Sequence, residues 1–335
     1  MRDKTSWTLP PVESSTFEWL VGHAVLAPSS HNTQPWIVEP HGISGFDLYV
    51  DRDRLLPEVD PYGRQIHISQ GCFLEGAALA ARARSLSVDI DYFPRGCYGE
   101  GEFDDRPVAR LSVAPGGPEP TPFEERLFEA IPDRRSNKRT FRKSGEITDD
   151  QKASLHDAAV VSQDPLAVRL TLIDEPVKLR QLTYICRDAM QVEVSSRRRN
   201  AELAEWFRFS RRELREKRDG LGLSQSGTSG LTRWFVEKFL LNREEAADPN
   251  GDFARQGVRM CEAQASSATA FAGVLTAGNS RTDQLIAGRT FMRLQLLATS
   301  LGIATQPLSQ PLQEYEGMTE QKRRMETTVG TMPEE

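Results

Sequence analysis

Two distant stretches of this chain present the same order of structural elements, and this echo limits the folds that the chain can adopt. Residues 71–94 read GCFLEGAALAARARSLSVDIDYFP and residues 288–307 read GRTFMRLQLLATSLGIATQP. Each begins with glycine and continues through a helix with a small or apolar face, a short turn, a strand and a proline. Any helix–strand unit can produce such a pattern, so a duplication also requires complementary motifs in the two halves. The echo favours a chain built from two related halves, each with helices and strands.

The boundary between the halves is predicted at residues 114–122, APGGPEPTP, whose prolines and glycines cannot sustain a helix or a strand ladder. This linker separates a first half, residues 1–114, from a second half, residues 123–335. Hydrophobic spacing and capping residues predict helices at 14–26, 64–86, 123–130, 148–160, 177–192, 201–219, 231–241 and 282–301. Strands are predicted at 46–50, 87–93, 108–113, 167–173 and 267–276.

Composition and charge narrow the class of protein. Hydrophobic residues make up 38% and charged residues 27% of the 335, as in an ordinary globular protein, and the net charge of −6 provides no basic field for nucleic acid. A polar N-terminal stretch and the lack of an apolar run of about 18 residues predict a soluble, cytoplasmic protein without a membrane segment. The four cysteines and five histidines show neither CxxC nor HExxH spacing, so we expect no disulfide framework and no metal site.

The first polar loop, here named the serine loop, is residues 27–36, APSSHNTQPW. Its two prolines restrict their own φ angles and their neighbours, so the loop is stiff and loses less entropy on binding a ligand. His31 either adds a functional polar group or faces solvent. The alternative for the whole loop is a polar turn that caps a helix end. Hydroxyl and amide side chains that suit the edge of a flat heteroaromatic ring or a polyhydroxyl chain are Ser29, Ser30, Asn32 and Gln34.

The second polar loop, here named the basic loop, is residues 133–141, DRRSNKRTF. Its four cations are Arg134, Arg135, Lys138 and Arg139. Cations interleaved with Ser136 and Asn137 suit a phosphate attached to a polyol, because the charges balance the phosphate and the neutral groups bind hydroxyls. The alternatives are a solvated basic turn or a patch for nucleic acid.

Together the two loops resemble the signature segments of the FMN-dependent nitroreductase family. One is an R-x-S-x-[RK] loop that binds the flavin phosphate and ribityl chain, and the other is a P-S-S-x-N-x-Q-P-W loop supplied by the other subunit of a dimer. Family chains carry both with the basic loop first, whereas here each occurs once, in the reverse order. Residues 63–71, GRQIHISQG, and 303–312, IATQPLSQPL, also resemble the Acg-like subfamily. The resemblance implies a nitroreductase-like α+β fold in which two fused halves, arranged around antiparallel or mixed sheets, form a single-chain pseudo-dimer with one FMN site.

The resemblance assigns the basic loop and a C-terminal segment to the cofactor. Either Arg134, Ser136 and Lys138 bind the phosphate and ribityl chain, or Arg135 and Arg139 are the phosphate ligands, because the expected phenylalanine falls one place late. The family's C-terminal Lys/Arg phosphate clamp has only KRR at 322–324 as a counterpart. A backbone N–H near Ser309 is expected to reach the reactive flavin nitrogen and to tune hydride acceptance. The segment that provides it consists of Pro307, Leu308, Ser309 and Gln310.

The serine loop is expected to reach the same cofactor from the opposite half of the molecule. The insertion at about 193–255 is longer than a minimal nitroreductase needs and resembles the lid that is thought to cover the flavin in Acg-like proteins. The residues expected to face the ribityl chain and ring are Pro28, Ser29, Ser30, Asn32 and Gln34.

The implied function is an oxidoreductase in which FMN takes a hydride from NAD(P)H and passes electrons to a nitroaromatic, quinone or other small acceptor. No catalytic side chain is predicted, because the flavin would carry the chemistry. One alternative is an FMN-binding or sequestering protein whose lid prevents turnover, and another is a regulatory module that presents the basic loop to an acidic partner. Since both loops lie in one chain, we expect a monomer.

Overall fold

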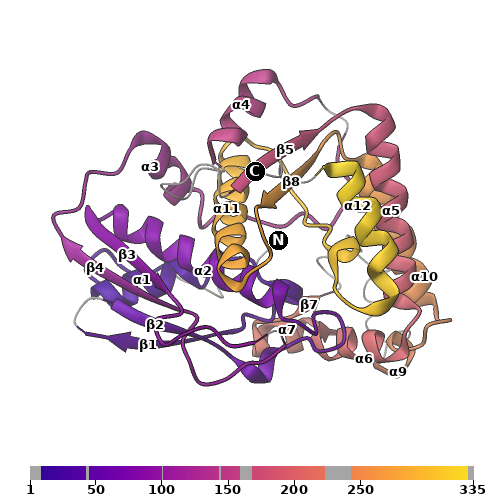
Figure 1. Ribbon diagram of the computed structural model, residues 1–335, viewed down its shortest axis with the longest axis horizontal. Coiled ribbons are helices and arrows are strands. Elements are labelled where there is room, and N and C mark those ends of the chain that lie inside the picture. Colours follow the sequence, from indigo (N-terminus) through magenta and orange to yellow (C-terminus); the bar gives the residue numbers. More distant parts are fainter. Residues whose placement is uncertain are drawn as a thin grey trace.

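The computed structural model describes residues 9–42, 45–99, 101–142, 145–158, 168–222 and 243–330. Figure 1 shows a four-stranded sheet flanked by helices at one side of the molecule and a helical layer at the other. The first half contains α1 (Thr16–Ala24), η1 (Ser30–Asn32), β1 (Trp36–His41), β2 (Gly45–Val50), η2 (Arg52–Arg54), α2 (Arg64–Arg82), β3 (Leu86–Tyr92) and β4 (Ala109–Pro115). The sheet is antiparallel in the order β1-β2-β4-β3.

The second half is mainly helical, and outside the insertion its described residues form a two-stranded antiparallel ladder, β5 with β8. Outside the insertion it comprises α3 (Pro122–Glu129), α4 (Asp149–Ala158), β5 (Val168–Ile173), α5 (Pro176–Val194), α10 (Asp252–Ser267), β8 (Phe271–Thr276), α11 (Arg281–Ser300), η4 (Gln310–Leu312), η5 (Glu316–Met318) and α12 (Thr319–Val329). The described chain is therefore an α+β protein, and its sheets are antiparallel except for one short parallel pair in the insertion.

Side-chain caps fix the helix starts that the sequence predicted. Ser15 and Glu18 form a reciprocal capping box at α1, and Ser280 and Asp283 do so at α11. At α4 the Thr148 hydroxyl accepts the N–H of Gln151, and the Gln151 side chain accepts the N–H of Thr148, as predicted. Each box satisfies two N–H groups that the first helical turn leaves without partners.

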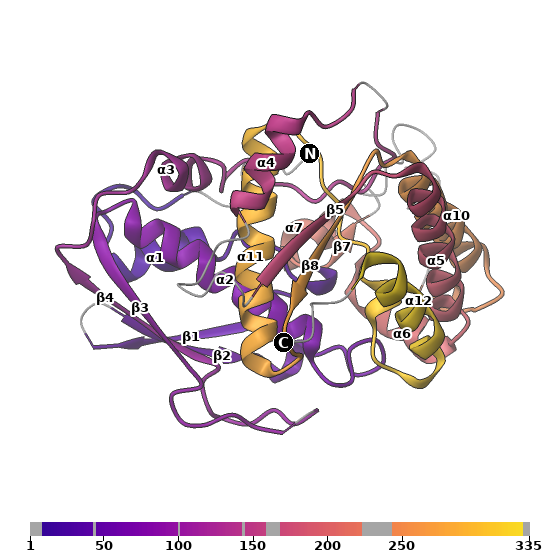
Figure 2. The same ribbon diagram turned by 45° about the horizontal axis from the view of Figure 1, so that its top comes forward.

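Helices α2 and α11 cross near the centre of the molecule (Figures 1 and 2), and a glycine of each helix lies at their contact. A Cβ atom added to Gly71 would lie 2.0 Å from the carbonyl oxygen of Leu285, and one added to Gly288 would lie 2.0 Å from that of Ile68. Each added Cβ would also lie 3.0 Å from the Cα of the other glycine. The contact is therefore reciprocal, and it joins the two glycines that begin the two echoed stretches.

The main hydrophobic core spans both halves, because α11 packs against α2 within it. Large buried members include Phe46, Phe73 and Leu297. Within this core the Glu75 carboxylate accepts hydrogen bonds from Arg289 at 2.8 Å and Arg293 at 2.9 Å. Burial raises the pKa of Glu75, but the two guanidinium groups outweigh that effect and leave the pKa below its usual value. A smaller core lies between α5, α10, α12 and β8.

The insertion differs from the predicted single helix at 201–219. It forms α6 (Arg197–Trp206), β6 (Phe207–Arg208), α7 (Arg211–Lys217), β7 (Leu221–Gly222) and α9 (Arg243–Ala246). The helix breaks because Phe207 is extended and buried against Phe253, and because Ser210 starts α7 by capping the N–H of Glu213. The predicted helix at 231–241 lies outside the described residues.

Other expectations also need correction. The second echoed stretch does not end in a sheet strand: residues 301–309 contribute only an isolated parallel bridge between Thr305 and Ser136. The strand predicted at 267–276 begins at Phe271, because α10 continues to Ser267. Among the longer elements, β1, α10 and α12 were not predicted. In the described part of the chain no helix is long and apolar enough to cross a bilayer.

Candidate functional site

The serine loop follows α1 and has an unusual backbone. His31, Asn32 and Gln34 have φ angles of 46°, 54° and 54°, in the left-handed region that residues other than glycine rarely adopt. Each such residue costs of order 1 kcal/mol or more, so the surroundings must hold the loop in this shape. Ser29 and Ser30 do so: the Ser29 hydroxyl accepts the N–H of Gln34 at 3.0 Å, and the N–H of Ser30 donates to the Ser69 hydroxyl on α2 at 3.1 Å.

The basic loop reaches the serine loop through Arg134. This side chain is 3% exposed, and it donates to the Leu26 carbonyl at 3.1 Å and to Gln295 Oε1 on α11 at 3.0 Å. Leu26 immediately precedes the serine loop. A buried guanidinium therefore ties the start of the second half to the polar loop of the first half, as the predicted shared site requires.

The C-terminal segment joins the same place. Ser136 forms a parallel bridge with Thr305, and the N–H of Asn137 donates to the Thr305 carbonyl at 2.8 Å. The chain then continues into Pro307 and the short helix η4. The serine loop, the basic loop and residues 305–310 thus converge, and we refer to these three segments together as the loop junction.

The four cations of the basic loop differ in burial. Arg135 and Arg139 are exposed, and the Arg135 guanidinium donates to backbone carbonyls of its own loop. Arg134 is buried in the cross-link to Leu26. Lys138 is partly buried, and desolvation lowers the pKa of its ammonium group. Lys138 is therefore the inward-facing cation best placed to meet an anionic group at the loop junction.

His31 of the serine loop lies close enough to Lys138 of the basic loop to sense its positive charge. Burial, and secondly the positive charge of Lys138, lower the pKa of His31 to about 4, so the imidazole is neutral near pH 7. Its Nδ1 atom is buried and has no hydrogen-bond partner among the described residues. The sequence left open whether this side chain faces solvent, and the structure encloses its Nδ1.

Several buried polar atoms at the loop junction lack hydrogen-bond partners among the described residues, and FMN suits the site if its own donors and acceptors match them. Within the described chain Gln306 Oε1 and Gln310 Oε1 are enclosed without a hydrogen bond, like His31 Nδ1. Buried polar groups are normally satisfied, so this set indicates a polar occupant with both donors and acceptors. The edge of the isoalloxazine ring and the ribityl hydroxyls of FMN provide both, and the residues present fit that cofactor.

Two glutamines behind the junction were missed by sequence reasoning. Gln264 on α10 donates to the Lys138 carbonyl at 2.7 Å, and its Oε1 accepts from Gln306 Nε2 at 2.6 Å. This chain of amides holds the basic loop against residues 305–310. No sequence signal indicates it, because Gln264 is 126 residues from Lys138 and belongs to a helix that was not predicted.

The insertion packs on the outer side of the serine loop. The Asn32 side chain donates to the Gly220 carbonyl, and the N–H of Gly220 donates to the Asn32 carbonyl, both at 3.0 Å. The Gln34 side chain donates to the Arg218 carbonyl at 2.9 Å. These two amide side chains, predicted as cofactor contacts, are therefore engaged with the insertion.

A charged cluster strengthens this attachment. Arg54 donates to the Thr33 carbonyl at 2.8 Å and to Asp219 at 3.0 Å, and the other oxygen of Asp219 accepts from Arg208 at 2.6 Å. The side chains of Arg208 and Asp219 are 3% and 10% exposed, so the pair is largely desolvated. Charge pairs of this kind are costly to break.

Two cavities that the structure contains, of about 760 and 1030 Å³, are lined by none of the predicted cofactor residues. The KRR stretch at 322–324 lies on α12, where each cation has a carboxylate partner. Lys322 contacts Glu314 at the wall of the smaller cavity. The described contacts therefore commit these three cations to carboxylates instead of leaving them for a phosphate clamp.

Comparisons with known proteins point to one class. No protein-family model matches the chain. Over 73 residues the chain is 36% identical to a Mycobacterium tuberculosis protein named "Putative NAD(P)H nitroreductase acg", and the match covers 21% of each chain. Over 129 residues it is 30% identical to "Putative NAD(P)H nitroreductase Rv3131" of the same organism, covering 38% of this chain and 35% of that protein. The chain thus matches between about a fifth and just over a third of the length of these relatives, which supports a relationship to the nitroreductases.

Proposed function

We propose that the chain is a nitroreductase-like flavoprotein of the Acg-like type that holds one FMN at the loop junction. It would accept a hydride from NAD(P)H and reduce a small acceptor of the nitroaromatic or quinone type. One observation carries the proposal: Arg134 of the basic loop is hydrogen-bonded to the Leu26 carbonyl beside the serine loop, so two segments 108 residues apart lie next to each other. The partial similarity to proteins named nitroreductases supports the same class.

The residues of the loop junction have distinct roles in this proposal. Lys138 and Ser136 would bind the phosphate and ribityl chain, and Ser29 and Ser30 would contact the cofactor from the first half. The backbone N–H of Ser309 would donate to the reactive nitrogen of the ring. FMN would supply hydride acceptance and electron donation, while the protein positions it and excludes water. Arg134, whose guanidinium is hydrogen-bonded inside the protein, would position the basic loop.

The reciprocal contact of Gly71 and Gly288 supports an internal pseudo-twofold axis. Across a twofold axis, contacts are reciprocal: if residue i of one half contacts residue j of the other, then residue j of the first half contacts residue i of the second. Here the two equivalent positions of the echo touch each other. We therefore propose a fused pseudo-dimer with a single site, and a monomer in solution, because no second chain is needed to complete the site.

A second candidate function is FMN binding with little turnover. It is favoured by the attachment of the insertion to the serine loop through Asn32, Gln34 and Asp219. If that segment covers the exposed face of the ring, nicotinamide cannot dock there and the protein sequesters its cofactor.

A visible spectrum separates these possibilities. The protein is purified with added FMN, freed of excess cofactor and mixed with NADPH under anaerobic conditions. Rapid bleaching of the flavin band supports the reductase, and a bound flavin that stays oxidised supports sequestration. A protein that FMN cannot saturate contradicts both.

A pair of charge-removing variants tests the site itself. Lys138→Met should weaken FMN binding by about tenfold to a hundredfold, as expected for the loss of one charge-assisted phosphate contact. Arg135→Met removes the same charge from an exposed position three residues earlier and should change the affinity little. Affinity is measured by quenching of flavin fluorescence. A larger loss for Arg135→Met than for Lys138→Met would show that the alternative register of the basic loop is correct.

A further inference from the structure

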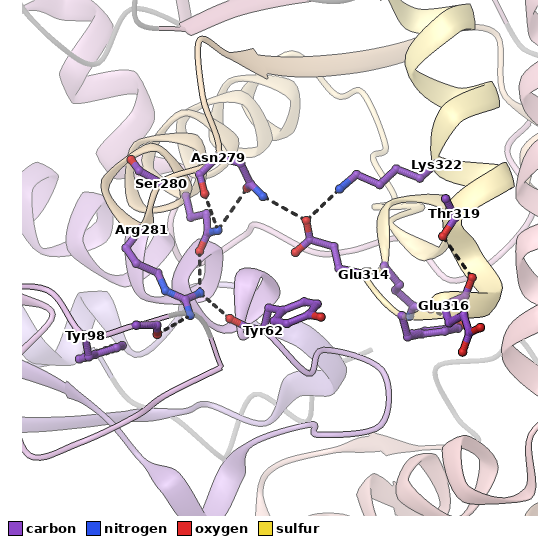
Figure 3. A pocket seen from close by; sticks show the side chains of 13 residues that line it. Tyr62, Tyr98, Asn279, Ser280, Arg281, Glu314, Glu316, Thr319 and Lys322 are labelled. Atoms are coloured by element: carbon purple, nitrogen blue, oxygen red, sulfur yellow. Dashed lines mark hydrogen bonds and ion pairs between the residues drawn. The ribbon is translucent and has the colours of Figure 1, made fainter.

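A cavity of about 760 Å³ lies between the two halves, away from the loop junction (Figure 3). One side is formed by Tyr62 and Tyr98 of the first half and by the start of α11, and the other by η5 and α12. Its volume is that of an ordinary small-molecule site. The proposed flavin function uses none of its lining residues.

At the wall of the cavity lies a buried cation that forms no ion pair with any described residue. Arg281, the first residue of α11, is 6% exposed, and its guanidinium donates to the carbonyls of Tyr62 and Gly99 and to Gln284 Oε1. All of these acceptors are uncharged. Among the described residues no carboxylate lies within ion-pair distance of Arg281, and its Nε has no hydrogen-bond partner. A desolvated charge without a counter-ion is costly, and an anion in the adjoining cavity would offset that cost.

The acidic groups of the cavity do not neutralise Arg281. Oε1 of Glu314 is held by Lys322 at 2.9 Å and by Asn279 at 3.0 Å, so this carboxylate already has its own cation. Glu316 is exposed and lies at the far end of the cavity from Arg281 in Figure 3. The cavity next to Arg281 therefore retains one uncompensated positive charge.

The start of α11 also faces the cavity. Its first turn already holds the Asp283 carboxylate, which accepts the N–H and the hydroxyl of Ser280, so the positive charge on this side of the cavity comes from Arg281. Ser280 and Arg281 of this first turn both line the cavity, and so does Tyr62, whose side chain is 46% exposed and offers an aromatic surface. One unpaired positive charge suits a monoanion better than a phosphate dianion, which would need a second unpaired cation.

We infer that this cavity is a second small-molecule site and that it binds an aromatic carboxylate. The carboxylate lies toward Arg281 and the α11 N-terminus, and the ring lies against Tyr62. Because residues of both halves line the cavity, a bound ligand also stabilises their contact.

The test uses the full chain with benzoate as probe and benzamide as its uncharged counterpart. Binding is measured by ligand-observed NMR and by the rise in unfolding temperature with probe concentration, without FMN and with FMN added. We expect benzoate to bind at least about tenfold more tightly than benzamide, because one charge-assisted contact contributes roughly that factor in affinity. Its affinity should be the same with and without FMN, so the result does not depend on the proposed flavin function.

Three variants locate the site. Lys322→Met leaves Glu314 without its cation and should weaken benzoate binding about tenfold or more. Glu314→Gln frees Lys322 and should tighten binding several-fold, a gain that general damage to the fold would not produce. Arg323→Met is the matched control, because it removes a neighbouring α12 cation that pairs with exposed Glu320, and it should have no effect.

Three results would overturn the inference. The first is equal or absent binding of benzoate and benzamide. The second is a Glu314→Gln protein that binds benzoate no more tightly than the wild type. Competition between benzoate and FMN would also overturn it, because it would place the probe at the loop junction instead of this cavity.

Discussion

The crossing of α2 and α11 allows a sharp test of how the two halves fit together. In a Gly71→Ala protein the new Cβ would lie 2.0 Å from the Leu285 carbonyl oxygen and 2.9 Å from its carbonyl carbon. Ordinary contact begins near 3.4 Å, so these atoms must separate by roughly 1.4 Å. The obstacle is helix backbone, which cannot rotate away as a flexible side chain can. The two helices must therefore move apart along their shared core.

The expected cost follows from two opposing terms. Overpacking a tight interior costs about 1–3 kcal/mol, and an immovable backbone obstacle places this site at the upper end. Alanine recovers up to about 1 kcal/mol of helix propensity relative to glycine. We expect Gly71→Ala to lower the free energy of unfolding by about 2 kcal/mol, measured by urea unfolding followed by circular dichroism. Gly257→Ala in α10 is the control, because its Cβ would be 3.9 Å from the nearest atom, and it should be neutral or slightly stabilising.

The reciprocity of the contact gives a second test. Gly288→Ala should cost as much as Gly71→Ala, because its Cβ meets the Ile68 carbonyl oxygen at the same 2.0 Å. The double variant should cost less than the sum of the two, since one separation of the helices relieves both clashes. A Gly71→Ala protein within about 0.5 kcal/mol of wild type would refute the close crossing. Fully additive costs would refute the idea that the two glycines share one contact.

Three further outcomes are expected. Glu75→Gln leaves two buried guanidinium groups without their carboxylate and should lower the free energy of unfolding, measured with urea, by about 3–5 kcal/mol. Substitution of an exposed carboxylate by its amide should change this free energy little. Glu202 accepts the N–H groups of Glu58 and Val59, and burial raises its pKa to about 7. Because the folded pKa exceeds the unfolded value of about 4.3, its contribution to stability is full below about pH 4.3 and declines as pH rises to about 7. Glu202→Gln should therefore flatten the pH dependence of the unfolding free energy between about pH 5 and 7, and an unchanged slope would contradict this. Asp219→Asn should speed hydrogen–deuterium exchange in residues 206–222 while exchange in α2 stays unchanged, and equal exchange in both proteins would show that the cluster does not hold the insertion.

Local signals in the sequence predicted many helices and strands in both halves. The caps of α1, α4 and α11 lie where serine or threonine precedes an acidic or amide residue by three positions, because this interaction is complete within one helical turn. The strands β2, β3, β4 and β5 lie within a few residues of their predicted ranges, because the alternation of apolar and polar residues along a strand is also a local property. Of the echo, the two helices that contain Gly71 and Gly288 are confirmed and their glycines touch, whereas residues 301–309 do not form the expected strand.

Expectations failed where contacts distant in sequence decide the conformation. The charged stretch 201–219 has the composition of one helix, yet packing of Phe207 on Phe253 and pairing of Arg208 with Asp219 extend the chain between α6 and α7. The segment after α11 has the composition of a strand but finds only Ser136 as a bridge partner. A strand needs a neighbouring strand for its backbone groups, and no local pattern provides one.

The sequence alone determined which loops carry polar and cationic groups, since these are properties of residue types and of prolines that stiffen the chain. Only the tertiary structure decided which of these groups face one another. It buried Arg134 against Leu26, turned Lys138 and His31 inward, directed Asn32 and Gln34 to the insertion, and left Arg281 beside an open cavity. The physical reason is that burial and pairing depend on atoms contributed by distant segments, and these set the cost of each charge and the partner of each hydrogen bond.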